Sequence, residues 1–229
     1  MPPLLCFLSS PLLGPSVWRP VTDALEGSGW QTLIVSAHEP PPTGSGDVLT
    51  SFLRQIPGHE SVALIPHSNA GLYVAPIIES RAVVATVFVD ARLPSGESRA
   101  ALAPAPLLEF LAARADDQGL LPPWTQWWPE DDVASLFPSV DVRAGIEGEQ
   151  PRVPLAYFRD SVDAPSGWDT IPCAFLAFGA TDSEETREAE RRGWRVRTLN
   201  GGHLHMLVDS AEVAAQIETL LTSMRLHES

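Results

Sequence analysis

The chain has 229 residues, of which 44% are apolar and 19% are charged, a composition typical of a globular protein with a sizeable core. This length suits one α/β domain, or one domain that carries an insertion. The formal net charge of −14 argues against nucleic acid or an anionic membrane surface as a partner, because both would be repelled. We therefore expect a small, largely apolar molecule as the substrate, and a homodimer is left open.

The first residues are apolar, but their pattern is not that of a signal peptide. The segment lacks a basic leader and contains Pro2 and Pro3, so we interpret residues 4–8 as the first strand of a cytoplasmic protein. No apolar run is long enough to span a bilayer. Cys6 and Cys173 fall in apolar strand-like runs and lack the spacing of metal ligands, so we predict two buried reduced thiols, no metal and no cofactor.

Strands and helices alternate along the first ninety residues. The expected strands cover residues 4–8, 31–37, 61–66 and 83–89, and the expected helices cover residues 17–25, 48–55 and 69–81. Such alternation is typical of βαβ units, so the sequence predicts an α/β fold with a mostly parallel sheet flanked by helices. Ligands of such sheets bind at the carboxyl ends of the strands, and functional residues are expected there.

The rhythm changes between residues 93 and 169. This stretch is rich in proline, has only short helical pieces, and carries four of the seven tryptophans, at positions 124, 127, 128 and 168. We predict a helical cap of residues 93–169, inserted into a core of residues 1–92 and 170–229, with Trp127 and Trp128 lining an apolar substrate pocket. Alternatively, any one of these tryptophans only buries the cap against the core. The strand pattern then resumes at residues 173–178 and 194–199.

The most informative stretch is the strand-to-helix junction around Ser68. The apolar run of residues 61–66 passes directly into a small-residue segment, and the serine sits at the turn in the order Pro-His-Ser-Asn-Ala. A serine on such a turn presents its hydroxyl above the end of the sheet, where the N–H groups of the helix start point at whatever it attacks. The usual pattern of this nucleophile elbow is Gly-x-Ser-x-Gly, which Ala70 nearly fits and Pro66 does not. Alternatively, Ser68 is only an N-cap.

A serine nucleophile needs a base, and the best candidate is His203, which follows the last expected strand on a Gly-Gly loop. His205 competes, but beside two apolar residues it is better explained by packing. His67 points the other way along its strand and is interpreted as structural. The imidazole also needs a carboxylate, and both Asp90 and Asp182 follow strands at the same edge of the sheet. At least one of them is a capping or solvated aspartate, and the residues alone leave the choice open.

The order of these features resembles the α/β-hydrolase superfamily over nearly the whole chain outside the cap. The shared features are a serine elbow, a carboxylate after a later strand, and Gly-Gly-His before the last helix. The resemblance implies Ser68 as the nucleophile, His203 as the base, and Asp182 as the acid, by the Gly-x-x-Asp pattern that begins at Gly179. Some members of the superfamily carry the acid one strand earlier, which is Asp90 here.

The resemblance also implies an oxyanion hole formed by the N–H of Asn69 and a second N–H from the loop after the first strand. In that loop Ser9-Ser10 replaces the superfamily's His-Gly pair, and the next residue is Pro11, which has no N–H. Leu12 is the candidate replacement donor. Because losing one oxyanion donor typically costs about 100- to 1,000-fold in rate, this departure predicts slow hydrolysis of ordinary esters.

These observations lead to three hypotheses from different functional classes. The first is a serine hydrolase that acts on a small, largely apolar ester, thioester or lactone through a Ser-His-Asp triad. The second keeps the fold but uses His203 as a general acid and base in a non-hydrolytic lyase, dehydratase or cyclase of secondary metabolism. The third is a protein that binds an apolar ligand under the tryptophan-rich cap without catalysis.

Overall fold

The structure is a computed structural model that describes residues 2–94, 98–179 and 183–224. Its centre is a six-stranded parallel sheet with the strand order β2-β1-β3-β4-β7-β8. The strands are β1 (Leu4–Leu8), β2 (Thr32–Val35), β3 (Val62–Ser68), β4 (Val83–Ala91), β7 (Cys173–Phe178) and β8 (Arg195–Leu199). This arrangement confirms the predicted α/β fold with a mostly parallel sheet.

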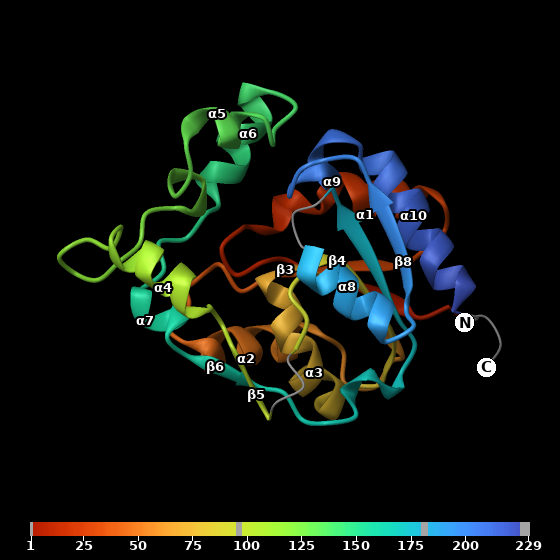
Figure 1. Ribbon diagram of the computed structural model, residues 1–229. Helices are drawn as coiled ribbons and strands as arrows, with labels where there is room; N and C mark the ends of the chain where they lie inside the picture. The colour runs from red at the N-terminus through yellow and green to blue at the C-terminus, as the bar shows by residue number, and fades with distance from the viewer. Residues whose placement is uncertain (1, 95–97, 180–182, 225–229) are drawn as a thin grey trace.

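Helices cover both faces of the sheet (Figure 1). They are α1 (Arg19–Gly27), α2 (Ser45–Gln55), α3 (Val74–Ser80), α8 (Ser183–Arg191), α9 (His205–Val208) and α10 (Ser210–Ser223). Leu5 and Phe7 of β1 pack in one core cluster with residues of α1 and α10. Cys6 and Leu8, which alternate with them, pack in a second cluster with residues of α2 and α3. Both faces of β1 are therefore buried, and β3, β4 and β7 are buried along most of their length, which explains why these four strands are nearly continuous apolar runs.

The helix expected over residues 69–81 is divided in the structure. A 3-10 helix, η2 (Asn69–Tyr73), comes first and α3 follows it. Pro76 explains the division, because it has no N–H to donate to the carbonyl of Leu72 and is tolerated only in the first turn of an α-helix. The helix expected over residues 17–25 likewise begins with a 3-10 turn, η1 (Pro15–Val17), before α1.

Between β4 and β7 the chain leaves the central sheet. The described part of this segment contains a small antiparallel sheet of β5 (Arg99–Ala101) and β6 (Ser161–Asp163). Its helices are α4 (Ala105–Ala112), η3 (Trp124–Gln126), α5 (Glu130–Ala134), α6 (Val140–Gly148), α7 (Leu155–Phe158) and η4 (Trp168–Thr170). Figure 1 shows α5 and α6 standing away from the central sheet, as a separate group of helices. The division into a core and a cap at residues 93 and 169 stays a prediction.

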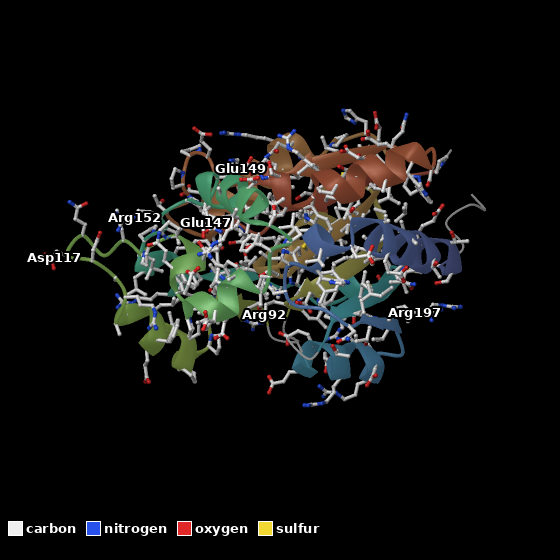
Figure 2. All side chains as sticks on the ribbon, turned by 90° about the horizontal axis from the view of Figure 1, so that it is seen from above. Arg92, Asp117, Glu147, Glu149, Arg152 and Arg197 are labelled. Carbon is white, nitrogen blue, oxygen red and sulfur yellow. The ribbon has the colours of Figure 1, made fainter. Side chains whose placement is uncertain are left out.

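Two carboxylates fasten this segment to the rest of the molecule. Glu149, directly after α6, accepts hydrogen bonds from the N–H of Ser16 at 3.0 Å and from its hydroxyl at 2.5 Å. Figure 2 shows Glu149 where the green α6 meets the red N-terminal part of the chain. Asp160 accepts from the N–H and the hydroxyl of Ser45, at 2.9 and 2.6 Å. The hydrogen bonds from Ser45 lower the pKa of Asp160, and they place its negative charge at the N-terminus of α2.

Cys6 and Cys173 are both free and buried. Burial raises the pKa of each thiol to about 12, because the apolar surroundings disfavour the thiolate. Among the described residues, every helix is too short or too polar to cross a membrane.

Candidate active site

Ser68 is the last residue of β3 and has a strained backbone conformation. Its φ of 56° and ψ of −131° lie outside the regions that residues with a side chain normally adopt. The chain turns there from β3 directly into η2, so the side chain lies at the carboxyl end of a central strand. Pro66 pairs with Leu8, the last residue of β1, near the carboxyl end of β3, and it has no N–H to donate to a neighbouring strand.

Asp90 lies near the carboxyl end of β4 and is fully buried. Its φ of 42° is the other positive value at a described residue that is not glycine. Oδ1 accepts the N–H of Phe178 at 3.0 Å, and Oδ2 lies 2.6 Å from Nδ1 of His203. Because a carboxylate only accepts hydrogen bonds, His203 donates from Nδ1. The structure thus brings Asp90 and His203 together, whereas Asp182 lies outside the described residues.

His67 contacts the segment that carries His203, which the sequence did not indicate. Its Nε2–H donates to the carbonyl of His203 at 3.0 Å, and the centres of the two rings are 4.5 Å apart. Complete burial and the proximity of His203 hold the pKa of His67 well below its ordinary value. His67 therefore stays neutral and supports the backbone of His203. His205 begins α9 instead, with its ring against Phe178.

A cavity of about 470 Å³ lies against Ser68 and His203. Leu12, Asn69, Trp127 and Trp128 also line it, so the structure brings together these residues singled out in the sequence. Trp124 lines it as well, with its ring centre 5.9 Å from that of His203. Trp168 lies elsewhere, against Phe88 and Trp194, and so serves packing.

The loop after β1 folds as a turn around Pro11. The N–H of Leu13 donates to the carbonyl of Ser10 at 2.9 Å, and the N–H of Leu12 donates to the Ser10 hydroxyl at 3.3 Å. The second bond is long and therefore weak. The candidate oxyanion donor of this loop thus has a partner within the loop, and it must exchange that partner for an oxyanion.

Asn69 takes part in a buried polar network through its side chain, whereas the sequence indicated only its backbone N–H. The hydroxyl of Tyr157, in α7, donates to Asn69 Oδ1 at 2.9 Å, and the hydroxyl of Tyr73 lies 3.0 Å from that of Tyr157. Asn69 Nδ2 donates to the carbonyl of Leu102 at 3.2 Å. Burial raises the pKa of both phenols, which keeps them protonated. This network joins the residue after Ser68 to the segment predicted as the cap.

We expect Tyr157→Phe to destabilise the protein by about 1–3 kcal/mol, because it leaves a buried acceptor on Asn69 and a buried hydroxyl on Tyr73 without their partner. Tyr73→Phe is the matched control. It removes the outermost hydroxyl of this hydrogen-bond network and leaves the bond between Tyr157 and Asn69 intact, so its expected cost is about 0.5–1.5 kcal/mol. Urea unfolding of both variants measures the difference, and equal losses would contradict this role for Tyr157.

A second prediction concerns Gly71, beside which the carbonyl of Arg92 packs. A Cβ at this position would lie 2.0 Å from that oxygen, so the backbone would have to shift. Gly71→Ala is expected to cost about 1–3 kcal/mol of unfolding free energy. Gly145→Ala, in α6 with open space around the position, is expected to stabilise by about 0.5–1 kcal/mol. Thermal unfolding of the two variants should therefore shift in opposite directions.

Comparison with known proteins places these observations in a fold family. No protein-family model matches the chain, and no curated protein matches its sequence. An extracellular α/β-hydrolase from a Paenibacillus species, described as sharing structural and functional homology with tobacco salicylic acid binding protein 2, superposes with a TM-score of 0.71. The two are 15% identical, over 96% of this chain and 99% of that chain.

Two further solved structures are similar to the chain over nearly its whole length. Tomato methylketone synthase I, solved with 2-tridecanone, is 12% identical with a TM-score of 0.63, over 98% of this chain and 99% of that chain. Polyneuridine aldehyde esterase is 14% identical with a TM-score of 0.62, over 95% of this chain and 100% of that chain. The chain therefore has the α/β-hydrolase fold, as the sequence predicted.

Proposed function

We propose that the protein is a serine hydrolase that acts on a small, largely apolar carboxylic ester, thioester or lactone. The observation that carries this proposal is the buried Asp90 paired with His203 on the same cavity as the strained Ser68. A carboxylate that fixes an imidazole beside a serine on a strand-to-helix turn is the arrangement that activates a serine hydroxyl.

In this mechanism the hydroxyl oxygen of Ser68 attacks the substrate carbonyl, and Nε2 of His203 takes the serine proton. Asp90 holds the ring in the required tautomer and stabilises the imidazolium. The N–H of Asn69 donates a hydrogen bond to the developing oxyanion. His203 then protonates the leaving group, and a water molecule that it deprotonates releases the acyl group from Ser68.

The cavity supports a small substrate with apolar parts. Its volume is near the lower end of the range of ligand pockets, and tryptophan and leucine side chains form much of its lining. Esterases and hydrolases are among the proteins of similar structure, which supports the same class of reaction here.

A non-hydrolytic reaction is the second candidate, and the loop after β1 favours it. Pro11 has no N–H, and the N–H of Leu12 is already bonded to Ser10. A site with a weakened oxyanion hole suits general acid and base chemistry by His203 in a lyase, dehydratase or cyclase. Methylketone synthase, which shares the fold, is not named for ester hydrolysis.

The source of oxygen in the product separates the two candidates. We expect turnover of small acyl esters and thioesters in ¹⁸O-labelled water, with one ¹⁸O in the released acid. The Ser68→Ala variant is the control for spontaneous hydrolysis. Elimination or cyclisation products without solvent oxygen would support the second candidate, and a failure to turn over any member of the panel would contradict the first.

A further inference from the structure

The cavity beside Ser68 contains one arginine among the described residues that line it, Arg92. It follows β4, directly after Ala91, and its side chain is 34% exposed. Figure 2 shows Arg92 between the green part of the chain and the blue part that carries α8. The guanidinium is thus partly exposed to solvent where it borders a cavity lined largely by apolar side chains.

Two backbone contacts hold Arg92 in place relative to Ser68. Its N–H donates to the carbonyl of Ser68 at 3.0 Å. Its own carbonyl packs where a side chain on Gly71 would lie, so the glycine permits this close approach. The base of the arginine side chain is thus fixed to the turn that presents the serine hydroxyl.

In the part of the chain that the structure describes, the guanidinium of Arg92 is held through its Nε atom only. Nε of Arg92 donates to Oε1 of Glu185 at 2.6 Å, and the Glu185 side chain is 17% exposed. Within the described residues, the two Nη atoms have no hydrogen-bond partner. These atoms form a planar fork whose geometry matches a carboxylate. Asp132, an exposed residue of α5, also lines the cavity, and its negative charge would repel an anion bound there.

We infer that the substrate carries a carboxylate in addition to its apolar part, and that this group binds the Nη atoms of Arg92. The inference rests on the proposed function and narrows it, because it makes the substrate class an ester or thioester with a free carboxylate, such as the half-ester of a dicarboxylic acid. Glu185 orients the guanidinium before the substrate arrives, which reduces the entropy lost on binding.

Binding to the Ser68→Ala protein tests this without requiring turnover. The probes are the monomethyl esters of succinate, glutarate, adipate and pimelate, each paired with its neutral dimethyl ester and measured by calorimetry. At least one monomethyl ester should bind tenfold or more tightly than its dimethyl partner. Adding Arg92→Gln should weaken binding of that ester by about 10- to 100-fold and leave the dimethyl ester within about threefold.

Two variants serve as charge controls. Arg197→Gln removes an exposed arginine of β8, outside the cavity, and should leave both affinities unchanged. Asp132→Asn removes a negative charge from the cavity and should tighten the monomethyl ester only. Opposite effects of two substitutions in one cavity are not expected from a general loss of folding. Arg92→Lys should recover part of the affinity, since it restores the charge without the fork.

Equal or tighter binding of the neutral esters, or equal losses for both esters in Arg92→Gln, would overturn the inference. Turnover of neutral esters by the unsubstituted protein would then still support the hydrolase. Conversely, a carboxylate preference that depends on Arg92 in a protein without ester turnover would support the binding site and contradict the proposed reaction.

Discussion

Replacing Ser68 by alanine is expected to lower kcat for ester hydrolysis by about 10,000-fold or more, while the protein stays folded. The loss is large because attack, proton transfer and acyl-enzyme formation all need the hydroxyl oxygen. Alanine would adopt the same strained φ of 56° at this position. The substitution therefore removes the hydroxyl without relieving the backbone strain.

His203→Ala provides the matching measurement. Groups that act as a unit lose their activity together, so the double variant Ser68→Ala, His203→Ala should be about as slow as either single variant. Steady-state rates of the three proteins test this, and urea unfolding confirms that each is folded. Independent, multiplying losses, or activity retained in either single variant, would contradict a shared role in catalysis.

Asp90→Asn is the second substitution with a large expected effect, a loss of about 10,000-fold in kcat with little change in KM. The amide keeps the shape of the side chain and an oxygen for the N–H of Phe178. Its NH₂ group, however, would donate to Nδ1 of His203 and place the ring proton on Nε2, where the ring can no longer accept the proton of Ser68.

Asp182→Asn is the comparison for this prediction, because the sequence proposes either aspartate as the acid. Steady-state kinetics of both variants on one substrate decide between the two. A larger loss in Asp182→Asn than in Asp90→Asn would reject the mechanism in which Asp90 is the acid.

The fold was readable from the sequence because the strands are short apolar runs separated by turn residues and helical patterns. The strands expected over residues 4–8, 61–66 and 173–178 correspond to β1, β3 and β7. Local pattern could not show that the helix after Ser68 begins as a 3-10 helix. That depends on Pro76, a single residue whose missing N–H acts several positions away.

The residues of the candidate site differ in how clearly the sequence indicates them. Ser68 and His203 stand out because each follows a strand in a distinctive local pattern. The choice between Asp90 and Asp182 depends on distances across the sheet, which neither residue's neighbours in the sequence encode. A backbone φ of 42° at Asp90, and its contact with a residue 113 positions away, appear only in the folded chain.

The polar network around Asn69 shows the same limit. Tyr157 reaches this side chain across 88 positions, and no local pattern links a tyrosine in a short helix to an asparagine after a strand. The contact of His67 with the carbonyl of His203 was missed for the same reason. The sequence signal for a supporting role of His67 is a histidine beside a serine at the end of an apolar strand, where it is expected to be buried.

Labelling with a fluorophosphonate, read at peptide level by mass spectrometry, tests the central claim most directly, because this reagent reacts with an activated serine. We expect a single adduct, on Ser68, that is lost in His203→Ala and in Asp90→Asn. An unlabelled Ser68 in folded protein, or labelling that persists without His203, would contradict the proposed nucleophile and its activation.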